Sequence, residues 1–373
     1  MNFEIVDKKL GRYQISEGIT ENELEKIGND KTVKTIQFSK PLSIKKIELL
    51  EKNIFSKRKD ILLRVYGFYK ECDLSFLNEI PSLTKFSADC LSEAKNVNYI
   101  TELKNLCELG IGIYNLKDFY FFESLNPKLK KLYITKTESK KPSIKSISRF
   151  SELESLYLEG QQKGIESLNG LKKLEKLTLR SISTKNVEYL SNLENLKELE
   201  IKLGGIKDFE ALKTLPNLAY LELWQIRGLN NLDFISNLTS LQMISLESLK
   251  NVTNFPNVEK LKLLRRVGLE NMKGLKNIKN LKNSQSLEDF IFFEAVNFEP
   301  KSIIPILENS NIKNVRCFFG SEMKNKEFEI LAEKYNKSNK ITLFEINTVP
   351  NNVYNLLLAF CSLSKVLADF LGQ

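Results

Sequence analysis

The chain has 373 residues, a formal net charge of +9 at pH 7 and no histidine. The absence of histidine excludes Ser-His-Asp and Cys-His catalysis, histidine-ligated zinc and the commonest general base. No Walker loop, dinucleotide glycine fingerprint or calcium loop is present, because Gly110-Ile111-Gly112 lacks a third glycine. Carboxylate-only hydrolysis stays open in principle, but we expect no enzyme, no cofactor and no metal site.

Residues 1–67 predict an N-terminal cap with irregular first repeats. The expected elements, in chain order, are strands at Phe3 to Val6 and Arg12 to Ile15, a helix capped by Thr20 and running through Ile27, a strand at Val33 to Phe38, a helix after Ser43, and a strand at Ile61 to Tyr66. The first eleven residues are charged and lack the apolar stretch of a secretory leader. We therefore expect a cytoplasmic protein.

Residues 68–320 repeat the frame Leu-x-x-Leu-x-Leu at intervals of 21 to 25 residues. The middle apolar residue of the frame falls at Phe86, Leu109, Leu132, Leu156, Leu177, Leu199, Leu221, Ile244, Val267, Phe290 and Val315. Before each frame, apolar residues recur at every third position, and within it they alternate. This change of period predicts a tight helical return followed by a strand. Because one such unit cannot bury its apolar face alone, the units must stack into a continuous core with a parallel sheet.

The frame and its spacing resemble those of bacterial leucine-rich repeat proteins, with a repeat length similar to the internalin type, over about residues 33 to 320. The resemblance implies an α/β fold, a leucine-rich repeat solenoid forming a right-handed arc, with a parallel concave β-sheet, a helical or 3-10 convex side, and atypical N- and C-terminal caps. Internalins are exported, whereas no secretory leader is expected here.

One departure from that family concerns the position three residues after the second strand leucine, where such repeats carry an asparagine that caps backbone groups. Here the position holds Tyr114, Gln161, Ile182, Gly204, Ile226, Leu249 and Met272. We expect apolar packing in place of the asparagine ladder, and a less regular curve.

Residues 321–373 predict a C-terminal helical cap. A helix from Ser321 to Tyr335 and a strand from Ile341 to Ile346 precede a helix from Asn352 to Leu371 that is apolar almost all round. Such a helix is normally buried, so we expect it to cover the last strand together with Ile291, Phe293 and Phe318. The alternative is a partner-binding or dimerising helix. The longest apolar run in this tail, Leu356 to Cys361, is far below the ~20 residues that span a bilayer.

The five cysteines are scattered, with no Cys-x-x-Cys pair, which favours reduced, inert thiols that are buried or half-buried. Cys317 occupies a core position of its strand.

The residues before, between and after the two alternating leucines are expected to face solvent on the concave side. These three columns contain seven basic and nine acidic residues, although the whole chain has a charge of +9. The basic excess therefore lies on the convex side and at the ends, for example at Lys128, Lys130, Lys136, Lys140, Lys141 and Lys145.

Aromatic residues in these columns suggest the binding site. The single tryptophan, Trp224, lies beside Tyr220 and Met243, while Tyr133 and Tyr157 form a second pair. Such residues dominate interface hot spots, although Trp224 could instead fold over a loop edge. The predicted partner-binding residues are Tyr133, Tyr157, Glu200, Tyr220, Glu222, Trp224 and Met243, with Glu200 and Glu222 as an acidic centre.

The sequence thus predicts a non-enzymatic bacterial interaction protein that binds a protein partner on its concave sheet, as an immunity protein, an effector or a recognition subunit. We expect no nucleic acid and no membrane as partners, and a monomer or weak dimer. The alternative is a binder of nucleic acid or of an anionic surface through the basic convex face.

Overall fold

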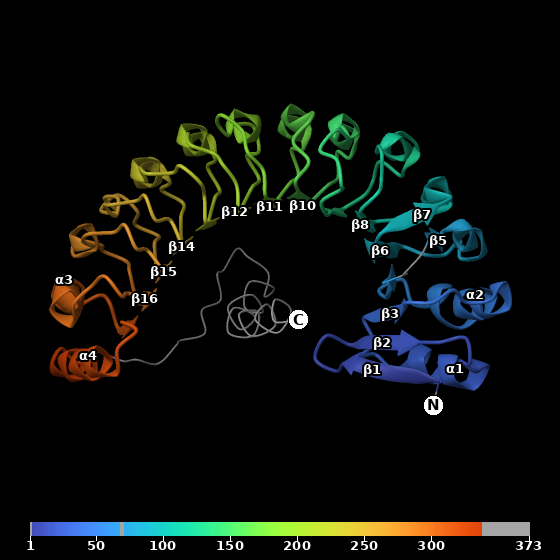
Figure 1. Ribbon diagram of the computed structural model, residues 1–373, viewed down its shortest axis with the longest axis horizontal. Coiled ribbons are helices and arrows are strands. Elements are labelled where there is room, and N and C mark those ends of the chain that lie inside the picture. Colours follow the sequence, from blue (N-terminus) through green and yellow to red (C-terminus); the bar gives the residue numbers. More distant parts are fainter. Residues whose placement is uncertain (1, 68–70, 338–373) are drawn as a thin grey trace. The chain divides into compact units, whose positions relative to one another are not determined.

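The N-terminal region begins with an antiparallel pair, β1 (Phe3–Asp7) and β2 (Arg12–Ile15), after which β3 (Thr35–Phe38) and β4 (Leu62–Tyr66) add in parallel. The computed structural model describes residues 2–67 and 71–337 (Figure 1).

Two helices alternate with these strands, α1 (Glu21–Asn29) and α2 (Ile44–Leu50), and a π-helical turn at Glu51–Phe55 continues α2. Thr20 caps α1 through a capping box, because its hydroxyl accepts from the Glu23 amide while the Glu23 carboxylate accepts from the Thr20 amide. The elements predicted for this region are confirmed.

By its internal contacts the chain divides into two compact units. Unit 1 comprises Met1–Thr184 and Glu188–Leu193, and unit 2 comprises Lys185–Val187 and Glu194–Gln373. The predicted boundaries at 67 and 320 do not coincide with this division and stay predictions.

Unit 1 contains a sheet in the order β1-β2-β3-β4-β6-β8-β9-β10-β11, in which every pairing after β1–β2 is parallel. Its repeat strands are β6 (Lys85–Leu91), β8 (Glu108–Ile113), β9 (Lys131–Ile134), β10 (Ser155–Glu159) and β11 (Lys176–Arg180). The returns contain 3-10 helices at Ser75–Glu79, Val97–Glu102, Tyr120–Ser124, Lys145–Arg149, Ile165–Gly170 and Glu188–Leu190. A small parallel pair, β5 (Glu71–Asp73) with β7 (Glu93–Lys95), was not anticipated from the sequence.

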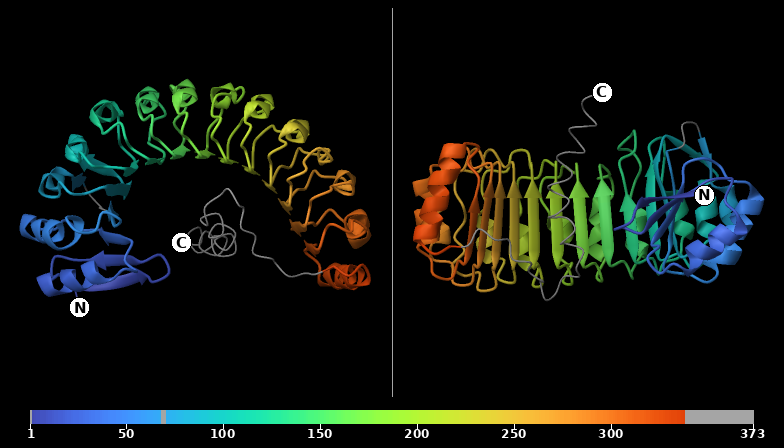
Figure 2. Two further views of the ribbon diagram at one scale, coloured as in Figure 1. Left: turned by 180° about the vertical axis from the view of Figure 1, so that it is seen from behind. Right: turned by 90° about the horizontal axis from the view of Figure 1, so that it is seen from below.

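Unit 2 contains a parallel sheet in the order β12-β13-β14-β15-β16-β17. The strands are β12 (Glu198–Lys202), β13 (Tyr220–Trp224), β14 (Met243–Glu247), β15 (Arg266–Glu270), β16 (Asp289–Phe293) and β17 (Asn314–Cys317). The 3-10 helices are Glu210–Thr214, Asp233–Asn237, Lys279–Leu281 and Pro300–Ile303, and α3 (Ile304–Leu307) and α4 (Glu322–Lys334) follow. In each unit the strands lie side by side and the helical segments lie on the other side of the core (Figure 2).

The core of each unit lies between the sheet and the helical returns. In β12 the two alternating frame residues, Leu199 and Ile201, are completely buried, as are Leu190, Leu193 and Leu196 from the preceding return. The equivalent residues of the other repeats are buried in the same way. The repeat frame read from the sequence is therefore the packing unit of the fold.

A residue in the left-handed region follows most repeat strands and continues the ladder around the corner. Gly160 adopts φ 82°, whereas Leu203, Gln225, Ser248 and Asn271 adopt φ between 50° and 55°. Each amide donates to the last carbonyl of the next strand, as from Leu203 N to Trp224 O (2.9 Å) and from Gln225 N to Glu247 O (2.8 Å). The conformation costs a non-glycine residue about 1 to 2 kcal/mol, but it allows the amide at the corner to continue the hydrogen-bond ladder.

The expected replacement of the asparagine ladder is confirmed at most positions. Ile182, Ile226, Leu249 and Met272 are buried apolar residues. Gln161 is the polar exception, and its buried amide hydrogen-bonds to the Thr137 hydroxyl (2.9 Å). Tyr114 differs, because its side chain is 46% exposed.

At the C-terminal end, α4 confirms the helix predicted from Ser321 to Tyr335. The expected strand at Ile341 to Ile346 and helix at Asn352 to Leu371 lie outside the described residues. Phe293 and Phe318 stack on each other with centroids 5.1 Å apart. No helix in the described part of the chain is long and apolar enough to cross a bilayer.

Three of the four described cysteines fit the expectation for thiols, since Cys72 and Cys317 are buried and Cys107 is half-buried. Cys90 is exposed, which corrects the prediction for that residue. It lies in the left-handed conformation (φ 54°) after the core part of β6, where the chain turns its side chain away from the core. Partial burial still raises the pKa of the Cys90 thiol, with Asp89 adding to the effect.

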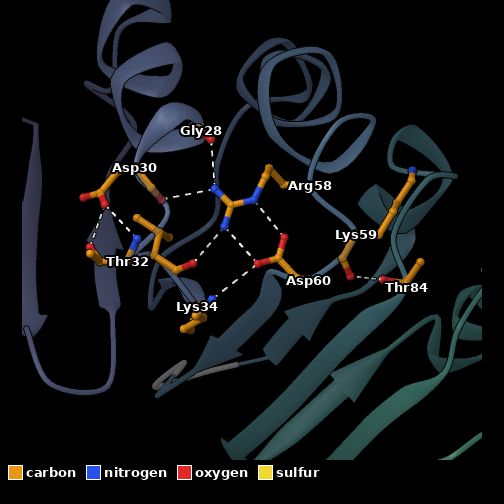
Figure 3. Close-up of polar contacts among 9 residues, drawn as sticks. Gly28, Asp30, Thr32, Lys34, Arg58, Lys59, Asp60 and Thr84 are labelled. Carbon is orange, nitrogen blue, oxygen red and sulfur yellow. Dashed lines mark hydrogen bonds and ion pairs between the residues drawn. The ribbon is translucent and has the colours of Figure 1, made fainter.

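Arg58 joins the first repeats of unit 1 (Figure 3). Its guanidinium donates to the backbone carbonyls of Gly28 (3.0 Å), Asp30 (3.1 Å) and Val33 (3.2 Å) and to the carboxylate of Asp60 (2.8 and 2.9 Å). One side chain thereby satisfies carbonyls of the last turn of α1 and of the loop between α1 and β3.

We expect Leu199→Ala to lower the free energy of unfolding by about 2 to 5 kcal/mol, because it leaves a cavity among fully buried neighbours. Each repeat contacts its neighbours only, so the loss should also broaden the thermal transition. Leu263→Ala is the control, since Leu263 is 51% exposed and should lose little stability. Equal melting curves for the two variants would contradict the assignment of Leu199 to the core.

We expect Arg58→Met to destabilise unit 1 by about 2 kcal/mol or more, because three backbone acceptors and one carboxylate lose their donor. The exposed Lys57→Met variant is the control. The hydrogen bonds from Arg58 hold the pKa of Asp60 well below its ordinary value of 3.8. This pair therefore stabilises the fold above about pH 4, and the contribution is lost as pH falls further. Urea melts at pH 7 and pH 2.5 should show a smaller acid-induced loss in Arg58→Met than in the parent.

Candidate functional site

The face of each sheet opposite the core, here called the outer sheet face, carries the side chains that alternate with the buried frame residues. Parallel pairing in register places equivalent residues in rows across the strands. In unit 2 one such row includes Glu200, Glu222 and Ser245, and the next includes Lys202, Trp224 and Glu247. In unit 1 a row includes Ser87, Gly110, Tyr133 and Tyr157.

In unit 2 the outer sheet face has a charged centre around Lys202. The Lys202 ammonium lies 2.8 Å from a carboxylate oxygen of Glu200 and 3.1 Å from one of Glu222. The Tyr220 hydroxyl donates to the other oxygen of Glu222 (2.9 Å). Burial raises the pKa of Glu222, although the Lys202 ammonium acts in the opposite direction. For Lys202, burial favours the neutral amine, but the two carboxylates outweigh this effect and raise its pKa.

Two further carboxylates lie side by side on the neighbouring strands of unit 2. Glu247 on β14 is the register partner of Glu270 on β15. Neither carboxylate forms an ion pair with any residue of the described ranges. Burial and repulsion from Glu270 and Glu222 raise the pKa of Glu247 to about 8, and burial with repulsion from Glu294 raises that of Glu270.

The seven predicted partner-binding residues are not all available as contact surface. Tyr133 is 42% exposed, and Tyr157 and Trp224 are half-buried. The expectation that the other four face solvent is wrong, because no more than 5% of each side chain is exposed at Glu200, Tyr220, Glu222 and Met243. Neighbouring strands lie about 4.8 Å apart, so long side chains in adjacent rows cover one another.

In unit 1 the aromatic pair of Tyr133 and Tyr157 lies beside a hollow. The rings of Tyr133 and Tyr157 stack with centroids 6.2 Å apart. On the other side of the pair, Gly110 and Gly112 carry no side chain, and a hollow of about 740 Å³ opens over them. A Cβ at Gly110 would lie 2.6 Å from the Ser87 hydroxyl oxygen and one at Gly112 would lie 2.9 Å from the Asp89 Cα, so the close approach of β6 requires both glycines.

An arginine network forms the far wall of this hollow. The Arg64 guanidinium donates to both oxygens of Asp89, at 2.6 to 3.0 Å, and to the side-chain oxygen of Gln37 at 2.9 Å. It also lies over the Tyr66 ring, 4.3 Å from the centroid. Gln37, Arg64 and Tyr66 were not among the predicted site residues, because they precede the regular frames that begin at Phe86. The register aligns Gln37 and Arg64 with Ser87 and Gly110, and this alignment is the signal that identifies them as outer-face residues.

The last strands of unit 2 carry a buried ion pair. Arg266 donates to Asp289 through Nε (3.1 Å), and the Asn314 amide donates to the other carboxylate oxygen (2.6 Å). Both partners are buried, so Arg266, Asp289 and Asn314 link the neighbouring strands β15, β16 and β17 through their side chains. No group of three or more His, Cys, Asp or Glu side chains in the described ranges could hold a metal ion.

The raised pKa of Glu247 predicts a pH dependence of stability. Its pKa is about 8 in the folded state and about 4.5 otherwise, so folding favours the protonated carboxyl. The contribution is therefore fully present below about pH 4.5 and is lost as pH rises through 8. We expect Glu247→Gln to flatten the fall in unfolding free energy between pH 5 and pH 8, as measured by urea melts, whereas exposed Glu259→Gln keeps the parent slope. A parent slope in Glu247→Gln would show that Glu247 is ionised normally.

No protein-family model and no curated protein matches the chain. Among solved structures, an internalin, InlF, from Listeria monocytogenes is similar with a TM-score of 0.55 at 19% identity, over 82% of this chain and 90% of that one. A second structure, a complex of TLR13 with ssRNA13, aligns with a TM-score of 0.44 at 17% identity, over 81% of this chain and 59% of that one. At these identities the likeness concerns the fold. The likeness to InlF, together with the repeat frame, the parallel sheets and the buried leucine columns, shows that this chain has the fold of a leucine-rich repeat solenoid.

Proposed function

We propose that the chain is a non-enzymatic scaffold that binds one protein partner on its outer sheet face, through a cationic segment of that partner. The observation that carries the proposal is the surplus of carboxylates in unit 2. Glu200 and Glu222 share one ammonium, and Glu247 and Glu270 lie side by side without an ion pair in the described ranges. The raised pKa leaves Glu247 largely protonated at neutral pH. A lysine or arginine of a partner would lower this pKa and pair with the carboxylates that then ionise.

Trp224 supplies the apolar contact next to these carboxylates. It is the register partner of both Lys202 and Glu247, and its side chain is half-buried. Tyr220 and Met243 are buried register partners on the same sheet face and serve as support, while Tyr133 and Tyr157 offer aromatic surface on unit 1. A half-buried tryptophan beside carboxylates suits a lysine or arginine side chain, whose stem packs on the ring while its charge meets the acid.

The role in the cell that fits such a scaffold is that of a bacterial, cytoplasmic recognition protein. Immunity towards a toxin, action as an effector, and recognition within a defence or signalling complex all use a rigid binding template of this kind. The basic helical side supports nucleic-acid binding less well, because many of its lysines are paired, as in Lys130–Glu154, Lys173–Glu152 and Lys282–Glu308. Such pairing leaves no continuous basic stripe among those residues.

The test begins with a partner isolated by co-purification and continues with its measured affinity. We expect the double variant Glu247→Gln, Glu270→Gln to bind at least about tenfold more weakly and to show a reduced dependence on salt. The exposed Glu259→Gln, on the helical side of unit 2, is the control. Parent affinity and salt dependence in the double variant would contradict a cationic segment at this site.

Trp224→Ala should weaken partner binding by about 2 kcal/mol or more while leaving the melting curve nearly unchanged. A loss of stability without a loss of affinity would instead identify Trp224 as a packing residue of β13.

A further inference from the structure

We propose that the hollow over Gly110 and Gly112 in unit 1 is a second binding point, which receives an acidic side chain of the protein partner. The inference rests on the proposed function and extends it, because it assigns a second chemical requirement to the same partner. It concerns unit 1 alone and involves none of the carboxylates of unit 2.

The hollow is a built feature of the sheet. Two glycines form its floor, the locked Arg64–Asp89 pair forms one wall, and stacked Tyr133 and Tyr157 form the other. Its volume of about 740 Å³ lies within the range of sites that enclose small ligands or anchor side chains. A Cβ at either glycine would require Ser87 or Asp89 to move. Substitution of these glycines by larger residues is therefore hindered, and the hollow stays open.

The charges around the hollow favour an anion. Each carboxylate in its lining lies near a cation of the same unit: Asp89 with Arg64 (2.6 Å), Glu108 with Lys131 (4.0 Å) and Glu159 with Arg180 (3.4 Å).

Two cations of the lining remain unused. Arg12 and Lys136 make no ion pair and no side-chain hydrogen bond with any residue in the described part of the chain. The Arg12 Nε is buried and has no hydrogen-bond partner, which is costly for a guanidinium nitrogen.

A carboxylate satisfies these conditions better than other side-chain groups. It can accept two parallel hydrogen bonds from the planar guanidinium of Arg12. The apolar stem of a glutamate, or an aromatic neighbour in the partner, would pack on Tyr133 or on Leu62 of the lining. The partner is therefore expected to present an acidic residue to unit 1 as well as a basic segment to unit 2.

The hollow can be tested without the partner, using 3-phenylpropionate as a probe for a carboxylate on an apolar stem. Its matched control is 3-phenylpropionamide, which has the same shape and no charge. Binding to the full chain is measured by ligand-observed NMR and calorimetry. We expect the carboxylate to bind at least about tenfold more tightly than the amide, and Arg12→Gln to abolish that preference. The exposed Lys9→Gln should retain it.

Circular dichroism and melting curves of Arg12→Gln establish that the variant is folded, and Tyr133→Ala provides a second probe of the wall, with an expected loss of affinity for both compounds. Equal binding of carboxylate and amide, no binding of either, or an unchanged preference in Arg12→Gln would overturn the proposal. Stronger competition by inorganic phosphate than by 3-phenylpropionate would also overturn it, in favour of a phosphate site. These outcomes are independent of Glu247 and Glu270, so failure here leaves the proposed function to its own test.

Discussion

The structure depends on one constraint, which is that a single repeat exposes more apolar surface than it can cover. A short strand and a 3-10 return have one apolar side each, and only the adjacent repeats can shield the space between them. Leu199 and Ile201 are completely buried for this reason. The same constraint fixes the strands in register, and register in turn places polar residues in rows on the outer sheet face. The stacking of the leucines thus determines which polar side chains are neighbours on the outer sheet face.

The period of the leucines was sufficient to predict the strands, the returns and the apolar replacement of the asparagine ladder, because these features depend on local spacing. Burial on the outer sheet face could not be predicted in the same way. Glu200 and Glu222 look like solvent-facing residues in an alternating pattern, but their exposure depends on Lys202 and Tyr220, which reach them from the same and the next strand. Such mutual covering depends on side-chain length and direction across strands, which a one-dimensional pattern does not contain.

The two units differ in the charge that their outer faces leave unmatched. In unit 1 the carboxylates around the hollow lie near cations, and Arg12 is left over. In unit 2 the carboxylates exceed the cations around Lys202. The summed charge of the outer face does not reveal this contrast, because basic and acidic residues are nearly equal in number when both units are counted together. The Gly110-Ile111-Gly112 segment, uninformative as a nucleotide motif, lies at the hollow of unit 1 because two glycines leave the outer face of β8 without side chains there.

The left-handed corners after the strands have an evolutionary consequence. Gly160, Leu203, Gln225, Ser248 and Asn271 share one backbone conformation although their side chains have little in common. The hydrogen bond made at each corner uses the backbone amide, so the corner does not require one particular side chain. Every residue other than glycine still incurs the cost of the left-handed conformation. Several kinds of side chain can therefore stand at the border of the outer face while the backbone keeps one path.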